Sequence, residues 1–440
     1  MAMKITVIGL GYLGATHAIA MAELGHDVIG IEANPQRLTE LQNGQIPFHE
    51  PGLPEALSKV LKNGNIKFKA DHDEESREAD LHFLCVGTPQ LPGSYAANTE
   101  YLHSAVKALA PYLRQDAVIA GKSTVPVGTS AELSKLAEAE TGFRPHLAWN
   151  PEFLREGTAL EDSLRPDRIV IGVDDERSAE VLRKVYEPIT DHGTPFLVTD
   201  IPTAELVKVA ANSFLATKIS FINAMAEIAE VSGADAVQLA EAIGYDERIG
   251  NKFLRNGIGF GGGCLPKDIR AFMARAEELG VGSAVDFLAD IDDINLRRRE
   301  RVVDLLKREL GDIQGQKVLV LGAAFKPDSD DLRDSPAIAV AKLIKAAGAE
   351  VVIHDPISLA NVRAQNPDLG TEQDLGRAST GAAAVVLATE WREYRDMSPA
   401  VLAGVSTKLL IDGRNAMPVT KWQEAGWRII ALGRNVEATA

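Results

Sequence analysis

One stretch of the chain sets a cysteine on nearly bare backbone. Residues 259–268 read GFGGGCLPKD, so Cys264 follows a glycine-rich run and precedes Lys267 and Asp268. Glycines leave no packed side-chain surface, so we expect the Cys264 thiol to stand where a ligand can reach it. Pro266 favours the start of a helix, and a thiol near a helix N-terminus and a lysine ionises more readily than a buried one. Cys264 is therefore a candidate nucleophile, and its alternative role is a small buried residue at a turn.

The second cysteine has a different setting. Cys85 lies in the apolar run LHFLCVGTP at 81–89, where packing in the core is its expected role. Two such cysteines exclude a disulfide framework and a cysteine-rich zinc module, and they favour a reducing cytoplasm. The nine histidines are scattered and none lies at ligand spacing from Cys264, so we predict no metal centre.

Two polar residues of a central helical segment are further candidates. Lys208 and Asn212 stand four positions apart in an apolar pattern, and therefore on one face of the helix. If this face borders a cleft, the lysine would hold an oxyanion and the asparagine would add a neutral donor. Alternatively, the lysine stem lies along the apolar surface with its ammonium group in water. The sequence leaves both interpretations open.

Two carboxylates follow a strand-like segment. Residues 150–157 read NPEFLREG, which places Glu152 and Glu156 four positions apart. Glu152 is a candidate general base, and Glu156 is a candidate acceptor for a hydroxyl of a sugar or ribose. Solvation at the surface is the alternative role of both.

A glycine motif opens the chain. The residues GLGYLG fit G-x-G-x-x-G and stand between the strand-like run at 4–9 and a helical pattern at 15–24. Such glycines permit a tight turn, a close approach of a pyrophosphate and close packing of helix and strand. The candidate cofactor residues of this loop are Gly9, Gly11, Tyr12, Leu13 and Gly14.

The second strand, at 27–32, ends in Glu32. An acidic side chain at this point accepts hydrogen bonds from ribose hydroxyls and repels a 2′-phosphate, which favours NAD over NADP. Arg37, five residues on, either contacts the adenine or ribose or is a solvated residue of a helix face.

Two threonines end further strands. Thr88 follows the run at 81–87, and Thr124 ends GKST at 121–124. The latter is no ATP phosphate loop, because the required first glycine is replaced by Asp116. At the carboxyl edge of a parallel sheet both threonines are expected to line a cleft.

The elements that position these residues form two related halves. Alternating strand and helix patterns at the N-terminus return at 317–322, 337–348 and 350–356, and the segment at 203–310 is helical. We predict an α/β fold of two Rossmann-like, doubly wound parallel-sheet domains joined by a central helical domain. The expected boundaries are 1–200, 201–310 and 311–440. The first helical piece runs some thirty residues to Gly233 and is either a dimer surface or a core helix; we favour dimerisation.

The composition and net charge of the chain limit the classes of partner that we expect it to bind. The 440 residues carry 46 basic and 62 acidic side chains, a net charge of −16, with 45% hydrophobic residues. Such a balance is typical of a globular protein and disfavours binding to nucleic acid or an anionic membrane. The chain shows no leader pattern and no apolar run near the length of ~20 residues that spans a bilayer.

Taken together, the motifs resemble one family over essentially the whole chain. The motifs are the glycine motif, VGTP at 86–89, KSTVPVGT at 122–129, the segment with Glu152 and Glu156, the segment with Lys208 and Asn212, the cysteine loop, FKPDSDDLRDSP at 325–336 and DGRN at 412–415. In this order they resemble the nucleotide-sugar 6-dehydrogenases. RIGNKFLRNGIGFGGGC at 248–264 is more similar to the UDP-glucose branch than to the GDP-mannose branch or to the N-acetylmannosamine branch, whose glycine loop contains a histidine.

The resemblance implies a four-electron oxidation. The C6 alcohol of UDP-glucose would become the carboxylate of UDP-glucuronate in two hydride transfers to a pair of NAD molecules. By motif position, Cys264 would attack the C6 aldehyde to give a thiohemiacetal and then a thioester. Lys208 and Asn212 would stabilise the oxyanions, which favours a functional role for both.

Further roles follow by the same resemblance. Asp268 and Thr124 would hold a water that accepts the alcohol proton, and Glu152 would assist hydrolysis of the thioester. The NAD-contacting positions of the family are matched by Glu32, Arg37, Thr88, Thr124, Glu156, Lys267 and Arg333. Its substrate-contacting positions are matched by Glu152, Phe153, Leu154, Arg155, Glu156, Lys208, Asn212, Arg248, Phe253, Leu254, Arg255, Asn256, Gly257, Gly261, Lys326 and Arg414. The family also implies a homodimer, with a C-terminal domain for the UDP moiety.

Two residues depart from the family pattern. Glu32 stands where aspartate is usual, and Gly263 replaces a common serine beside Cys264. The alternatives to the UDP-glucose reaction are oxidation of GDP-mannose or another nucleotide sugar, a non-catalytic nucleotide sensor, and a hydroxy-acid dehydrogenase. The nucleophile and its partners are all present, which disfavours the sensor, and the cleft segments lack the histidine that the hydroxy-acid chemistry needs.

Overall fold

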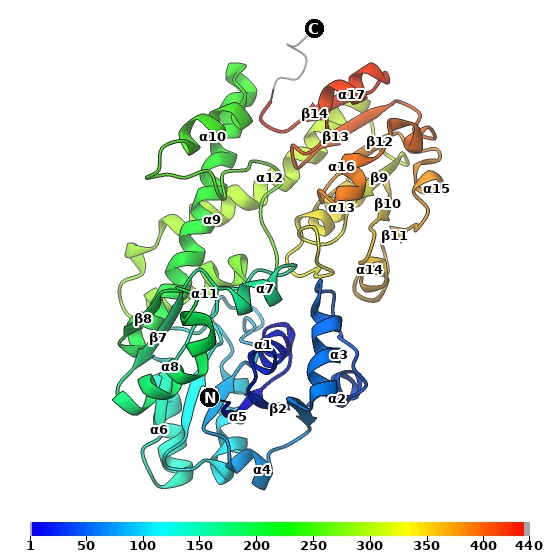
Figure 1. Cartoon of the computed structure of the whole chain (residues 1–440). Coiled ribbons are helices and arrows are strands. Elements are labelled where there is room, and N and C mark those ends of the chain that lie inside the picture. Colours follow the sequence, from blue (N-terminus) through cyan, green and yellow to red (C-terminus); the bar gives the residue numbers. More distant parts are fainter. Residues whose placement is uncertain (1, 435–440) are drawn as a thin grey trace. The chain divides into compact units, whose positions relative to one another are not determined.

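The computed structural model describes residues 2–434. The chain divides into two compact units, Met1–Ala211 with Ala274–Gly280, and Asn212–Met273 with Val281–Ala440 (Figure 1). Within residues 2–434 no helix is both long enough and apolar enough to cross a membrane.

The first unit is built on an eight-stranded sheet in the order β3-β2-β1-β4-β5-β6-β7-β8. Its strands are β1 (Lys4–Ile8), β2 (Asp27–Ile31), β3 (Ile66–Lys69), β4 (Leu81–Leu84), β5 (Val118–Gly121), β6 (His146–Trp149), β7 (Ile169–Val173) and β8 (Phe196–Thr199). All neighbours are parallel except β6 and β7, which run antiparallel. The segment between these two strands carries only a six-residue helix, α7, and returns the chain in the opposite direction.

Helices cover both faces of this sheet. They are α1 (Tyr12–Glu23), α2 (Pro35–Gln42), α3 (Leu53–Asn63), α4 (Glu74–Arg77), α5 (Glu100–Leu109), α6 (Thr129–Thr141), α7 (Ala159–Leu164) and α8 (Glu176–Thr190). Alternate residues of β1 enter two apolar clusters: Ile5 and Val7 pack with α1, α3 and α8, whereas Ile8 packs with α5 and α6. The predicted doubly wound sheet is therefore confirmed, with one antiparallel pair that the sequence pattern does not reveal.

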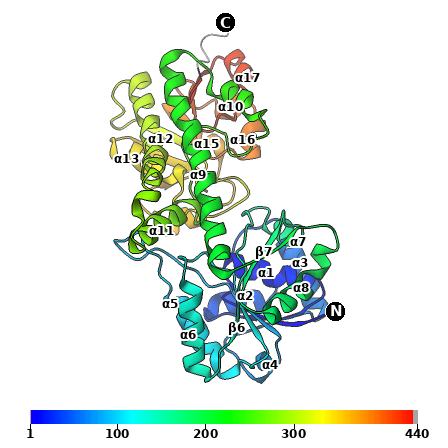
Figure 2. The same cartoon turned by 90° about the vertical axis from the view of Figure 1, so that its left-hand side faces the viewer.

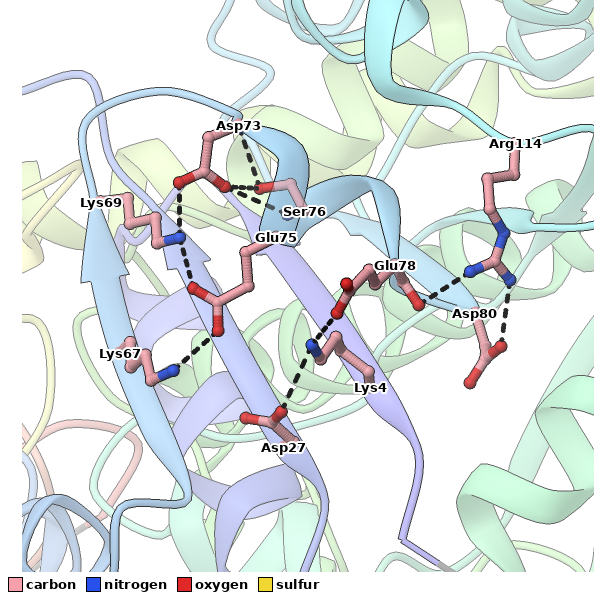
Figure 3. Close-up of polar contacts among 10 residues, drawn as sticks. All are labelled: Lys4, Asp27, Lys67, Lys69, Asp73, Glu75, Ser76, Glu78, Asp80 and Arg114. Carbon is pink, nitrogen blue, oxygen red and sulfur yellow. Dashed lines mark hydrogen bonds and ion pairs between the residues drawn. The ribbon is translucent and has the colours of Figure 1, made fainter.

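Figure 3 shows a network of charged side chains on β1, β2 and β3 and on the segments next to these strands. Lys69 Nζ lies 2.6 Å from both Asp73 and Glu75, and Lys67 Nζ lies 2.7 Å from Glu75. Hydrogen bonds from Lys67 and then Lys69 lower the pKa of Glu75 from 4.5 to about 2. These pairs tie β3 to α4, but each is partly exposed and contributes at most ~1 kcal/mol.

The second unit repeats the same architecture. Its sheet has the order β11-β10-β9-β12-β13-β14 and is parallel throughout the described residues. The strands are β9 (Lys317–Leu321), β10 (Glu350–His354), β11 (Gly370–Thr371), β12 (Ala384–Leu387), β13 (Leu409–Asp412) and β14 (Arg428–Ala431). This order matches β3-β2-β1-β4-β5-β6, so the two halves predicted from the sequence are related in topology as well as in pattern.

The corresponding helices also cover this sheet. They are α13 (Pro336–Ala346), α14 (Leu359–Gln365), α15 (Leu375–Ser379), α16 (Arg392–Asp396) and α17 (Val419–Glu424). Alternate residues of β9 enter two apolar clusters, since Val318 and Val320 pack with α13, whereas Leu319 and Leu321 pack with α15 and α17.

The segment that follows β8 and precedes β9 in the sequence is helical, as predicted. It contains α9 (Ile201–Ser232), α10 (Ala236–Gly244), α11 (Leu265–Glu278) and α12 (Phe287–Leu310). The helix α9 has 32 residues. Figure 2 shows it as one unbroken helix. It ends at Ser232, and the following Gly233 has a φ of +78°, the left-handed conformation that glycine adopts without strain.

Candidate active site

The glycine motif of the first unit forms the expected tight turn between β1 and α1. Gly9 has a φ of +86°, and a Cβ at this position would lie 2.7 Å from Val86 Cγ1. A Cβ on Gly14 would lie 1.8 Å from the Gly9 carbonyl oxygen, so the third glycine is required for packing. Beside Gly11 nothing lies within 4 Å of a Cβ, which leaves the backbone open to a pyrophosphate. This loop fits a dinucleotide.

Glu32 anchors this loop. Its carboxylate is 5% exposed and accepts hydrogen bonds from the backbone N–H of Leu10 at 2.9 Å and of Asn34 at 2.8 Å. Arg37 is paired with the same carboxylate at 3.2 Å, so it is more than a solvated helix residue. The longer glutamate at the family's aspartate position thus reaches the main chain of the glycine loop.

The structure brings the two strand-end threonines together. Thr88 Oγ1 donates a hydrogen bond to the Thr124 carbonyl oxygen at 2.7 Å. Nearby, Cys85 is 5% exposed and packs in the apolar core, as predicted, although β4 ends one residue before it. Burial raises the pKa of the Cys85 thiol to about 12, which makes it a poor nucleophile.

Lys208 lies in the interior of the first unit rather than in water. Its side chain is 6% exposed, and Nζ lies 3.0 Å from Glu152 Oε1. The other Glu152 oxygen accepts the backbone N–H of Leu154 at 2.8 Å. The Lys208 ammonium also lies 5.6 Å from the Phe153 ring centroid. The lysine and carboxylate segments, distant in sequence, therefore form one buried ion pair, and the interpretation of Lys208 as a solvated residue is excluded.

Lys122 is a second buried lysine of the first unit, and sequence analysis did not identify it as a site residue. Lys122, 6% exposed, donates to Asn150 Oδ1 at 3.0 Å and to the Tyr186 hydroxyl at 3.3 Å. Burial lowers its pKa from 10.5 to about 8. These side chains and Glu152 line a cavity of about 70 Å³. The only sequence signal was its place in the GKST run, which resembles a phosphate loop.

The other residues of the 150–157 segment differ in their exposure to solvent. Arg155 is exposed and its Nε donates to Asp162 Oδ2 at 2.9 Å, whereas Phe153, Leu154 and Glu156 are partly buried.

In the second unit, Cys264 is exposed and directly precedes α11, as the glycine run predicts. The first turn of this helix carries Asp268, which is 1% exposed. Asn212 Nδ2 donates to Asp268 Oδ2 at 2.6 Å, and Lys267 Nζ lies 2.7 Å from Asp268 Oδ1. The thiol thus stands one helical turn from a buried carboxylate that an amide and an ammonium group hold in place.

The glycine loop before Cys264 is held by α12, which sequence analysis also missed. Asn295 is fully buried; its Oδ1 accepts the Phe260 N–H at 2.7 Å and its Nδ2 donates to the Phe260 carbonyl at 3.0 Å. Arg299 donates to the same carbonyl at 3.0 Å. Gly259 has a φ of +90°, and its Cβ would lie 2.3 Å from Asn295 Oδ1. Nothing in the helical pattern of α12 marks Asn295 as different from a core residue.

Arg414 holds the same loop from the C-terminal half. Its guanidinium donates to the carbonyl oxygens of Gly259 and Ala388, both at 2.8 Å, and to that of Phe325 at 3.3 Å. Burial lowers its pKa. Lys326 is partly buried, with its ammonium group 5.4 Å from the Phe325 ring centroid.

Gly263, the second departure from the family pattern, has a structural reason. A Cβ at this position would lie 2.3 Å from Arg333 Cζ, so the missing side chain makes room for the guanidinium beside the cysteine loop. Arg333 is itself exposed and paired with Asp331 at 2.7 Å. A Cβ on Gly261 would lie 2.2 Å from the Asp334 carbonyl oxygen.

The predicted substrate residues at 253–257 are mixed. Leu254, Asn256 and Gly257 are buried, and Asn256 Nδ2 donates to the Leu432 carbonyl at 2.7 Å. Phe253 and Arg255 are exposed. Arg248, with 89% of its side chain exposed, pairs with Asp246 at 2.6 Å. This contact does not connect it to Cys264 or to Asp268.

Three family models match the chain in order. They are the NAD binding domain, the central domain and the UDP binding domain of the UDP-glucose/GDP-mannose dehydrogenase family, at residues 3–190, 202–297 and 319–418. The first match contains the glycine loop and Glu32, so NAD as the cofactor is confirmed.

Relatives match over the full length. A UDP-glucose 6-dehydrogenase of Rhizobium meliloti is 39% identical over 98% of this chain and 100% of its own, and one of Bacillus subtilis is 36% identical over 98% of each. The solved UDP-glucose dehydrogenase of Pyrobaculum islandicum has a TM-score of 0.90 and 37% identity over 99% of this chain and 98% of its own. A UDP-D-ManNAc dehydrogenase of Pyrococcus horikoshii reaches 0.85 with 27% identity, over 98% and 99%. With its motifs, its two sheets and these matches, the chain belongs to the UDP-glucose/GDP-mannose dehydrogenase family of oxidoreductases.

Proposed function

We propose that this enzyme is a UDP-glucose 6-dehydrogenase that forms UDP-glucuronate through a covalent intermediate on Cys264. The observation that carries the proposal is the exposed thiol at the start of α11, one turn from the buried Asp268 and its partners Asn212 and Lys267. Relatives named as UDP-glucose 6-dehydrogenases, 36–39% identical over the full length, support this substrate over GDP-mannose.

The proposed reaction uses this thiol as a nucleophile. NAD held by the glycine loop would supply the hydride acceptor, one molecule for each of the two oxidations of C6. After the first, the Cys264 thiolate adds to the aldehyde carbon and gives a thiohemiacetal; loss of the second hydride gives a thioester. Water then adds to the thioester carbonyl, the C–S bond breaks, and the products are a carboxylate and the thiol.

Named side chains assist these steps in the proposal. Asp268 holds the water that takes the alcohol proton, and Asn212 donates to the oxyanions. The Lys208–Glu152 pair supplies an ammonium group for an oxyanion and a carboxylate that takes a proton from the hydrolytic water. Their burial supports these roles, because a low dielectric strengthens such electrostatic interactions.

The binding roles are proposed from the same positions. The glycine loop, with Glu32, Arg37 and Thr88, would hold NAD, and the C-terminal half would hold the UDP moiety, supported by the match to a UDP binding domain. We also propose the domain division 1–200, 201–310 and 311–440, which the three matched ranges support.

The deciding experiment combines a substrate panel with one substitution. Wild-type enzyme should reduce NAD with UDP-glucose faster than with GDP-mannose or UDP-N-acetylmannosamine, measured as NADH absorbance. Cys264→Ser should abolish net UDP-glucuronate formation and leave NADH binding within twofold, because the nucleophile is lost and the nucleotide loop is untouched.

The matched control is the other cysteine. Cys85→Ala, in the core, should keep turnover at temperatures where the variant is folded. Unchanged steady-state NADH formation by Cys264→Ser would exclude the covalent mechanism, and a preference for GDP-mannose would exclude the proposed substrate.

A further inference from the structure

The segment between α2 and α3 carries a buried carboxylate that the proposed reaction does not use. Glu50 is 2% exposed and lies in the loop that leads to Leu53, the first residue of α3. Burying a carboxylate is costly unless hydrogen bonds compensate it, so its partners indicate its purpose.

The partners of Glu50 come from two distant parts of the first unit. Oε2 accepts the backbone N–H of Gly157 at 2.7 Å, and Oε1 accepts those of Ala159 at 2.6 Å and Leu160 at 3.4 Å. Oε2 also accepts a hydrogen bond from the Tyr12 hydroxyl. That hydroxyl in turn accepts the Gly157 N–H at 3.0 Å.

Each end of this link belongs to a functional segment. Tyr12 directly follows Gly11 and is the first residue of α1, and its ring lies 4.7 Å from that of Phe48, in the same loop as Glu50. Gly157 ends the NPEFLREG segment, which carries Glu152. Burial and then the hydrogen bond to Glu50 raise the pKa of Tyr12, so its hydroxyl remains a donor. The Glu50 carboxylate thus connects Tyr12, at the glycine loop, to the segment that carries the proposed base Glu152.

We propose that Glu50 is a positioning residue that couples NAD binding to nucleotide-sugar binding. Movement of the glycine loop around the cofactor is passed through Tyr12 and Glu50 to residues 152–156. This inference rests on the proposed function, because those residues are its substrate contacts. Coupling of this kind is reciprocal and typically amounts to roughly 5-fold or more in affinity.

The test measures binding in a complex that cannot react. NADH fluorescence titrations with and without saturating UDP-glucose give the coupling factor, since the reduced cofactor cannot accept a hydride. Wild type should show at least a fivefold change in NADH affinity. Glu50→Gln, which keeps the volume but has one acceptor oxygen where the carboxylate has two, should reduce the change to less than twofold. Tyr12→Phe should also reduce the change in NADH affinity. The double variant with Glu50→Gln should lose little more of this change than either single variant, because both substitutions break the same hydrogen-bonded link.

The matched control is Glu205, another buried glutamate of the same unit. It is 1% exposed and accepts the backbone N–H of Gly128 at 2.7 Å and of Ser130 at 2.8 Å, at the start of α6. Glu205→Gln and Glu50→Gln should both lower the melting temperature, but Glu205→Gln should keep the coupling. Wild-type coupling in Glu50→Gln, or equal loss in Glu205→Gln, would overturn the proposal. If wild type oxidises UDP-glucose but shows no coupling, this inference fails while the proposed function stands; if it oxidises another nucleotide sugar instead, the titrations use that sugar.

Discussion

At the scale of single residues, Lys122 shows how burial changes a common side chain. It directly follows β5, two residues before Thr124, but its ammonium group turns inward to Asn150 and Tyr186. Cys85, Glu152 and Lys208 are the charged or titratable groups that act on it. Desolvation dominates, and the pKa falls from 10.5 to about 8. The interior therefore opposes the charge that the lysine carries in the unfolded chain.

This shift predicts a pH-dependent stability. Between pH 8 and 10.5 the unfolded chain keeps a proton that folded Lys122 releases, so the folded state gains stability as the pH rises, whereas below pH 8 the cost of burial is fully present. Relative to Lys122→Met, wild type should gain up to about 3 kcal/mol in free energy of unfolding from pH 7.5 to 10.5. Urea unfolding followed by circular dichroism measures this difference. A difference that stays constant with pH would contradict the shift; the exposed Lys107→Met serves as the reference substitution.

At the scale of elements, some features were predictable because their signals are local. The glycine turn at 9–14, the start of α11 next to Pro266 and the end of α9 just before Gly233 each follow from residues adjacent in sequence. The antiparallel pairing of β6 with β7 has no such signal. The same holds for Asn295, whose contacts with Phe260 join residues 35 positions apart in the chain.

The role of α12 is testable through Asn295. Asn295→Ala removes both hydrogen bonds to Phe260 and loosens the loop that carries Cys264, so kcat/KM for UDP-glucose should fall by roughly 10- to 100-fold. NADH affinity should change by less than twofold, since the nucleotide loop belongs to the other unit. Asn295→Asp keeps one acceptor and should be intermediate.

The control for this prediction is Glu300→Ala, an exposed residue of the same helix. It should keep wild-type kinetics. A folded Asn295→Ala variant, verified by its melting temperature, with wild-type kcat/KM would show that the loop keeps its conformation without α12.

At the scale of the whole molecule, two halves of one topology have diverged at equivalent positions. In the first, Glu32 accepts the Leu10 N–H at 2.9 Å; in the second, Asp355 accepts the Ala323 N–H at 2.7 Å. Asp355 is further occupied by the indole N–H of Trp391 at 3.1 Å and is 2% exposed. The acid of the first half therefore pairs with an arginine, whereas the acid of the second half accepts an indole N–H. This supports a division of labour in which NAD binds the N-terminal half and a different nucleotide binds the C-terminal half.

The assembly is the remaining property of the whole molecule, and we propose that two copies pair through α9. Phe214, Phe221 and Ile228 are 67%, 46% and 57% exposed and stand seven residues apart, so they form one apolar stripe on the helix. A stripe with this period is complementary to itself in a second copy.

Wild type should therefore have twice the chain mass in size-exclusion chromatography with light scattering. Phe221→Glu should give monomers, because each interface would bury two unpaired charges. Tyr101→Glu, at an exposed aromatic residue of α5, should leave the mass unchanged. A monomeric wild type, or a dimer that persists in Phe221→Glu, would exclude pairing through this stripe.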